Sequence, residues 1–109
     1  MTYQQVADMI AGIGLPYAYY EFPDGTEIAP PFLCFLFPGS NDLAADDSNY
    51  QKVRPCRLEL YTDTKDFALE ARVEGALNAA GLFYTREEGF LDGERMNMVA
   101  YDFTVFITE

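Results

Sequence analysis

The chain has 109 residues, which suits one hydrophobic core and leaves little room for a second, so we expect a single domain over residues 1–109. Half of the residues are apolar and 16% are aromatic, which argues against a wholly disordered chain. The 18 acidic and 7 basic residues give a formal net charge of -11, and a surface of that sign repels nucleic-acid backbones and anionic lipid.

The first predicted element is a short amphipathic helix over about residues 3–13. Thr2 and Gln5 have the spacing of a capping box. The apolar residues that follow recur at helical spacing: Val6, Met9, Ile10 and Ile13. The helix is expected to stop at Gly14, which tolerates positive φ, because Pro16 cannot continue the helical hydrogen bonds.

Two strands are predicted next. Tyr17–Phe22 is rich in aromatic residues and ends at the turn-forming Pro23-Asp24-Gly25. Phe32–Phe37 is a continuous apolar run between two proline-containing segments, which is typical of a strand buried on both faces. A buried helical turn is the competing interpretation, but the short length and the flanking prolines favour a strand.

Residues 38–50 are polar and acidic without periodicity, and we expect them to form the longest irregular loop of the chain. A third strand begins at about Gln51, because Cys56, Leu58 and Leu60 alternate with polar residues. Pro55 lacks a backbone donor, so regular pairing is expected to begin near Cys56.

The second helix is predicted to start at the capping oxygens of Thr62, Asp63 and Thr64 and to end at Gly81. Its apolar stripe consists of Leu69, Val73, Ala76, Leu77 and Ala80. The residues expected to lie off this stripe, in water, are Glu70, Arg72, Glu74 and Asn78.

Two strands complete the chain, over Leu82–Glu87 and about Arg95–Thr108. The face of the last strand that should meet the helices consists of Val99, Tyr101, Phe103, Val105 and Ile107. A strand–helix–strand crossover leaves room for one strand between its ends. We therefore predict an α+β fold with a mainly antiparallel five-stranded sheet in the order 1-2-3-5-4, both helices on one face and the other face partly apolar.

The sequence offers little for catalysis. It has no histidine, the commonest general base and metal ligand, and no glycine-rich phosphate loop. Asp42, Asp46 and Asp47 do not have the spacing of a calcium-binding loop, so a solvated acidic loop is the favoured interpretation. Cys34 and Cys56 could form a bridge if their strands are neighbours, but buried free thiols are favoured. We predict no enzyme activity, no catalytic, cofactor-binding or metal-binding residues, and no cofactor.

Aromatic residues crowd the first two predicted strands, in greater number than one face of a small sheet must hold. They either complete a small core or form a surface that contacts other subunits. The candidate protein-interaction residues are Tyr19, Phe35, Phe37, Asp42, Asp46 and Asp47.

The segments that carry a family resemblance are Pro30–Phe35, Leu58–Asp66, Val73–Leu77 and the helix exit at Gly81–Tyr84. Through them the chain resembles small proteins encoded among the head-tail and tail genes of prophages. The resemblance covers nearly the whole chain, and its motifs are structural. The proteins that the chain resembles are tail terminator, tail completion and head-tail joining proteins. The resemblance implies a non-enzymatic virion protein that assembles as a ring, often a hexamer, against tail-tube or connector proteins. It also implies location in the bacterial host cytoplasm during assembly and then in the virion tail or head-tail junction.

Two alternatives remain beside this interpretation. An acidic inhibitor or DNA mimic would bind a basic enzyme that handles nucleic acid, and a small-molecule enzyme would need an acid, a base and a nucleophile that the sequence does not bring together. We expect no direct binding to nucleic acid, and the longest apolar stretch is too short to cross a membrane. The sequence leaves open the choice between terminator and joining roles, the ring size, and which sheet face or loop makes the contacts.

Overall fold

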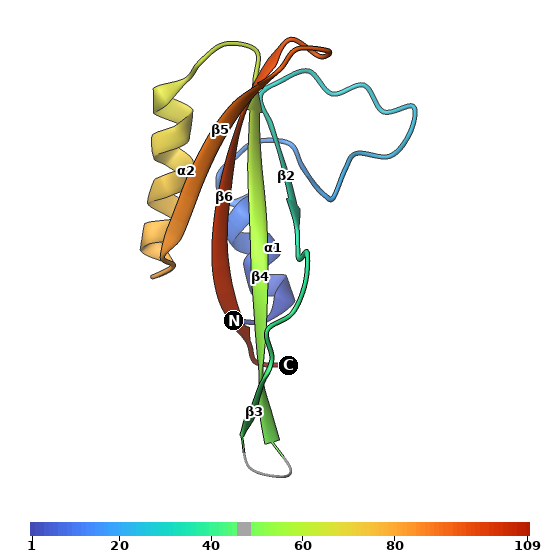
Figure 1. The fold of residues 1–109 in the computed structure, drawn as a ribbon. Helices are drawn as coiled ribbons and strands as arrows, with labels where there is room; N and C mark the ends of the chain where they lie inside the picture. Colours follow the sequence, from blue (N-terminus) through green and yellow to red (C-terminus); the bar gives the residue numbers. More distant parts are fainter. Residues whose placement is uncertain (46–48) are drawn as a thin grey trace.

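The computed structural model describes residues 1–45 and 49–109, whose Cα atoms extend 50 × 30 × 22 Å (Figure 1). The described residues form α1 (Tyr3–Ala11), β1 (Tyr17–Tyr19), β2 (Phe32–Leu36), β3 (Leu43–Ala45), β4 (Asn49–Thr62), α2 (Phe67–Ala79), β5 (Tyr84–Leu91) and β6 (Met96–Ile107). Neither α1 nor α2 has the length and apolar character that a bilayer-spanning helix needs.

The main sheet has the strand order β1-β2-β4-β6-β5. β1 and β2 run parallel, and every other neighbouring pair is antiparallel. Helix α2 connects β4 to β5, and β6 occupies the position between these two strands (Figure 1). The predicted order 1-2-3-5-4 is thereby confirmed, with β4, β5 and β6 as the third, fourth and fifth predicted strands.

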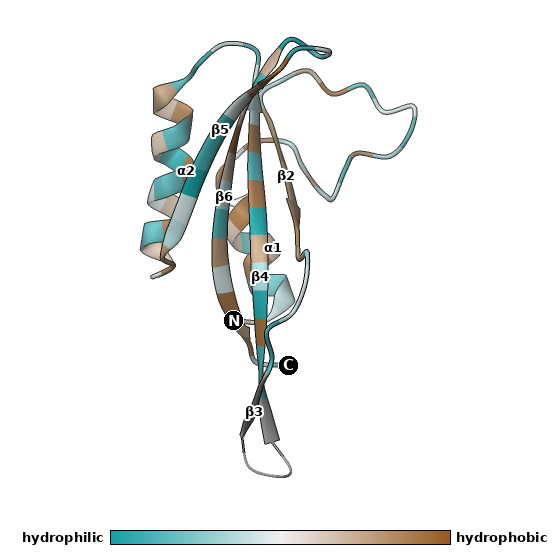
Figure 2. Ribbon diagram, in the orientation of Figure 1, coloured by the Kyte–Doolittle hydropathy of each residue, from teal (hydrophilic) through white to brown (hydrophobic). Residues whose placement is uncertain are grey.

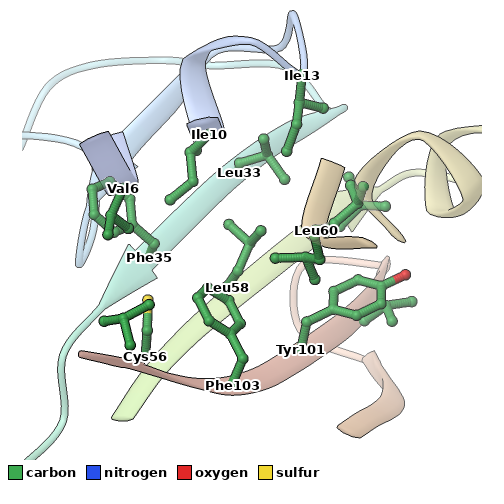
Figure 3. Close-up of a cluster of buried hydrophobic side chains, with 14 of the residues drawn as sticks. Val6, Ile10, Ile13, Leu33, Phe35, Cys56, Leu58, Leu60, Tyr101 and Phe103 are labelled. Carbon is green, nitrogen blue, oxygen red and sulfur yellow. The ribbon is translucent and has the colours of Figure 1, made fainter. Parts of the chain in front are cut away.

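The core lies between the sheet and the two helices, which pack on the same face. Val6 and Ile10 of α1 and Leu77 of α2 are completely buried. Opposite them lie alternate residues of the central strands, including Leu33, Leu58, Leu60, Tyr101 and Phe103, as Figure 3 shows. The alternation is visible along β4 and β6 in Figure 2. The five residues that we predicted would face the helices from the last strand are all buried, so that prediction is confirmed.

Helix α1 begins as the sequence predicts. The Thr2 side chain accepts a hydrogen bond from the Gln5 amide at 3.1 Å, and the Gln5 side chain accepts one from the Thr2 amide at 2.9 Å. The chain leaves the helix through Gly14, whose φ of +92° lies in the region that favours glycine. The helix itself ends at Ala11, two residues earlier than predicted.

Strand β1 is shorter than the predicted Tyr17–Phe22. Tyr20 donates its amide to the Phe35 carbonyl at 2.7 Å and adopts a φ of +68°, which turns the chain out of the sheet. Residues 20–31 then cross the sheet face opposite the helices, where Phe22 packs edge-on against Phe32 with 5.4 Å between ring centres. Aromatic content indicated a preference for strand, but it did not locate the turn.

We expected segment 38–50 to be irregular throughout, but part of it forms a strand pair. Leu43–Ala45 pairs with Asn49–Gln51 in an antiparallel hairpin that projects beyond the main sheet (Figure 1). Its base is fixed where Asn41 donates its amide to the Val53 carbonyl at 2.8 Å. The expectation was wrong for these residues because the backbone pairing of a hairpin requires no hydrophobic alternation in the sequence.

Strand β4 runs without interruption through Pro55, so the prediction that regular pairing starts near Cys56 was wrong. Pro55 lies opposite Thr104 of β6, whereas β2 pairs with β4 only as far as Arg57. The Phe106 carbonyl accepts a hydrogen bond from the Met1 amine and so points away from β4. The backbone groups of Thr104, two residues earlier on the same strand, also point away from β4. The donor that Pro55 lacks would therefore lie on the β2 side, beyond the end of β2.

Helix α2 is capped by Asp66, whose side chain accepts from the Leu69 amide at 3.0 Å, and not by the residues 62–64 that we predicted. The second difference is Glu70, which is only 5% exposed. Its carboxylate bonds to Lys65 at 2.7 Å and to Arg86 of β5 at 2.5 Å. Helical periodicity placed Glu70 off the apolar stripe, but the edge of the helix packs against β5, and the two cations compensate the buried charge.

Candidate protein-protein interface

Three of the predicted contact residues come together at the β1 edge of the sheet. The Tyr19 ring stacks on Phe37 with 6.1 Å between ring centres and meets Phe35 edge-on at 5.2 Å. Tyr3 of α1 meets Phe37 edge-on, with 5.2 Å between ring centres. We call Tyr3, Tyr19 and Phe37 the β1-edge cluster.

The three predicted contact residues at this edge, Tyr19, Phe35 and Phe37, differ in exposure. Tyr19 is 53% exposed and Phe37 is partly buried, whereas Phe35 is only 6% exposed and belongs to the core beneath α1. Strand alternation placed Phe35 and Phe37 on one face, and the structure shows that this face meets the helices. In this conformation Phe35 supports the cluster from below and offers no surface to a partner.

The predicted acidic contact residues lie at the hairpin. Asp42 accepts hydrogen bonds from the Val53 amide at 3.0 Å and from the Arg54 side chain, and Arg54 also donates to the Tyr3 hydroxyl at 3.2 Å. Desolvation, which would raise the pKa of Asp42, is outweighed by these hydrogen bonds, which lower it. Asp42 therefore links the hairpin base to the β1-edge cluster. Asp46 and Asp47 fall outside the described residues.

A second apolar surface, at the opposite edge of the sheet, was not found from the sequence. β5 begins at Tyr84, opposite Phe103, so β6 continues beyond the end of its neighbour. A groove of about 660 Å³ lies there between the end of α2, β6 and Met1. Phe83 and Phe106 line it and are 88% and 56% exposed. We call this the β6-edge groove.

A sequence signal for Phe106 did exist. The alternation that places Asp102 and Thr104 on the solvent face of the last strand places Phe106 there too. The alternation of the predicted strand Leu82–Glu87 likewise places Phe83 on the face opposite Leu82 and Tyr84, which pack against the core. Phe67, at the start of α2, is also strongly exposed, and its ring lies beneath the Lys65 ammonium at 4.8 Å.

The sheet face opposite the helices is mixed. At its centre Arg57 bonds to Asp102 at 3.0 Å and to Glu59 at 3.3 Å. At one end Phe32 stacks on Tyr61 at 4.9 Å, and residues 20–31 lie over this pair. The chain thus covers part of its own apolar surface, while Tyr19, Phe83 and Phe106 are exposed at the two sheet edges.

The cysteines are free and lie on opposite faces of the sheet, since Cys34 is paired with Glu59 and Cys56 with Phe103. Burial raises the pKa of Cys34 to about 11, with a smaller effect from Glu59, and that of Cys56 to about 12. These shifts oppose thiolate formation, so neither thiol has the environment of an activated nucleophile. Within residues 1–45 and 49–109, no three Cys, Asp or Glu side chains converge on a metal position.

Comparison with known proteins gives a likeness of fold. No family model matches the chain, and no curated protein matches it. Among solved structures, the chain is similar to one described as "Virion of native gene transfer agent (GTA) particle". The two share 18% sequence identity with a TM-score of 0.62, and the match covers 96% of this chain and 90% of the other. This similarity shows that the two chains have the same fold.

Proposed function

We propose that this chain is a non-enzymatic structural subunit of a phage-like particle, and that it assembles as a ring at the tail end or the head-tail junction. The observation that carries the proposal is the fold shared with a virion chain over nearly the full length of both chains. Fold alone does not fix function, so the arrangement of the surface must support the same role.

The exposed aromatic surfaces fit a subunit that contacts two neighbours. The β1-edge cluster and the β6-edge groove lie at opposite edges of one sheet. When two different patches on a subunit meet head to tail, the assembly closes into a ring if the rotation between subunits permits. Tyrosine and phenylalanine are enriched at such interfaces. We therefore expect Tyr19 of one copy to pack near Phe83 and Phe106 of the next.

The hairpin of β3 and β4 is a second proposed contact element, because it projects from the body and carries an acidic segment (Figure 1). Its contact with a neighbouring subunit or with the tail tube stays a prediction. Replacing the hairpin beyond Asp42 with a short turn should weaken ring assembly while the main sheet stays folded. Unchanged assembly and unchanged tube binding would remove the hairpin from the proposal.

Assembly can be tested by light scattering over a concentration series, followed by electron microscopy of the protein mixed with tail-tube subunits. We expect concentration-dependent oligomers, and rings or capped tubes in the mixed sample. Phe83→Ser and Phe106→Ser should weaken assembly, because both rings line the β6-edge groove. Phe90→Ser is the matched control, since Phe90 is 53% exposed but does not line the groove.

Two results would contradict the proposal. One is a protein that stays monomeric both alone and with tail-tube subunits. The other is competition with DNA for a basic nucleic-acid enzyme, which is the behaviour of an acidic inhibitor. Assembly that is equally weak in Phe83→Ser and Phe90→Ser would keep the function but place the interface elsewhere.

A further inference from the structure

The pocket beneath residues 20–31 is separate from both aromatic edge surfaces. Its volume is about 360 Å³, and it opens on the sheet face opposite the helices. Phe32 of β2 and Tyr61 of β4 line its floor as a stacked pair, and Phe22 of the crossing segment meets Phe32 edge-on. A cavity of this size and lining suits one or two apolar side chains.

The rim of the pocket is acidic. Glu21 comes from the crossing segment and Glu94 from the turn between β5 and β6. The same two segments also carry Asp24, Glu27 and Asp92, against the single cation Arg95. Within the described part of the chain, none of these five carboxylates takes part in an ion pair or accepts a side-chain hydrogen bond.

This lack of partners is unusual within the protein. Arg54, Arg57, Lys65 and Arg86 each form an ion pair with a carboxylate elsewhere in the fold. Arg72 donates to the Ile13 carbonyl and Lys52 donates to the Glu109 carbonyl. The cations of the chain are thus mostly occupied away from the pocket, and the charge at its mouth is left uncompensated. An apolar floor beneath uncompensated carboxylates is complementary to a ligand that is apolar at its tip and cationic at its flank.

We propose that this pocket binds a basic protein segment in which an apolar anchor side chain lies beside arginine or lysine. The anchor would rest on the Phe32 and Tyr61 rings, and the flanking cation would lie between Glu21 and Glu94. Tyr20 is 62% exposed at the same mouth and offers a ring face to a guanidinium. The proposal does not depend on ring assembly, because the pocket shares no lining residue with the β6-edge groove.

The probe is a set of blocked hexapeptides that carry two arginines beside one leucine, phenylalanine or tyrosine, with matched peptides in which glutamate replaces arginine. Binding is followed by amide chemical-shift changes in the ¹⁵N-labelled full chain at low salt. We expect the arginine peptides to shift residues 20–31 and 91–96, and the glutamate peptides to bind at least about tenfold more weakly.

Two double variants separate the pocket from the general acidity of the protein. Glu21→Gln with Glu94→Gln should lower the affinity about fivefold or more. Asp8→Asn with Glu87→Gln removes the same charge from two exposed positions outside the pocket lining and should leave the affinity nearly unchanged. Equal weakening by both pairs would overturn the proposal, because the attraction would then be unspecific.

Other outcomes would also overturn it. Spermine that displaces the peptides at equal charge concentration would mean that the apolar floor is not used. Shifts in residues 20–31 that depend on protein concentration without peptide would identify a second copy of the chain as the occupant. The absence of binding by every arginine peptide would leave the pocket without the proposed ligand.

Discussion

Glu70 is the residue whose replacement tests the packing of α2 most directly. Its two carboxylate oxygens serve different cations, Arg86 of β5 at 2.5 Å and Lys65 before the helix at 2.7 Å. Glu70→Gln keeps the shape of the side chain but replaces one acceptor oxygen with an NH2 group. That group cannot accept a hydrogen bond and would face a cation.

The expected size of the effect follows from these contacts. A hydrogen bond to a charged group contributes about 1.5–3 kcal/mol. The substitution removes one of the two bonds, and in the other an uncharged amide oxygen replaces the carboxylate as the acceptor from the cation. Lys65 and Arg86 have side chains that are 30% and 37% exposed, so water can partly replace the lost carboxylate. We therefore expect Glu70→Gln to lower the free energy of unfolding by about 2 kcal/mol, which corresponds to a fall in Tm of about 8 °C for a domain of this size.

Thermal and urea unfolding followed by circular dichroism measure this difference. Glu87→Gln is the matched control, because Glu87 is an exposed glutamate of β5 and its side chain makes no hydrogen bond or ion pair to the described residues. We expect its Tm to stay within about 2 °C of the wild type. If Glu70→Gln unfolds at the same temperature as Glu87→Gln, the reasoning that the carboxylate fastens α2 to β5 is refuted.

Three further predictions concern the helix cap, the core and the thiols. Thr2→Ala should lower the free energy of unfolding by about 1 kcal/mol because it removes one half of the capping box; an unchanged urea midpoint would contradict this. Leu58→Ala should cost about 3 kcal/mol, since Leu58 is completely buried at the centre of the sheet; a loss below about 1 kcal/mol would mean that the core closes over the cavity. Cys34 and Cys56 should resist a thiol reagent in the folded protein and react on unfolding, and rapid reaction in the folded state would contradict their burial. Burial raises the pKa of Cys34 to about 11 and that of Cys56 to about 12, from an ordinary value of 9.0. Their contribution to the free energy of unfolding is therefore complete below pH 9.0, and it is lost as the pH rises through about 11 and about 12.

The sequence by itself determined the two helices, the five strands of the main sheet and the order of those strands. Helical spacing after Thr2 and around Leu69, and strand alternation around Leu58 and Tyr101, are local patterns, so they identified which faces are buried. The crossover rule then placed β6 between β4 and β5. These inferences succeeded because periodicity and chain connectivity can be taken directly from neighbouring residues.

Local patterns were less successful where a contact joins distant segments. The hairpin of β3 and β4 depends on backbone pairing that has no hydrophobic signature, and continuous pairing through Pro55 depends on where β2 ends. Glu70 was assigned to water because its two cations lie on other elements. The Asp66 cap also differed from prediction, since several neighbouring oxygens were equally suitable in sequence.

The candidate interface divides in the same way. Aromatic content in the first strands pointed to Tyr19 and Phe37, but burial of Phe35 beneath α1 was decided by which sheet face the helices cover. The β6-edge groove exists because β5 starts opposite Phe103 and leaves the end of β6 without a strand partner. The pocket beneath residues 20–31 likewise requires the crossing segment to fold back over β2 and β4. Composition set how much apolar surface the chain carries, whereas tertiary packing decided which rings remain exposed, because exposure depends on what the rest of the chain covers.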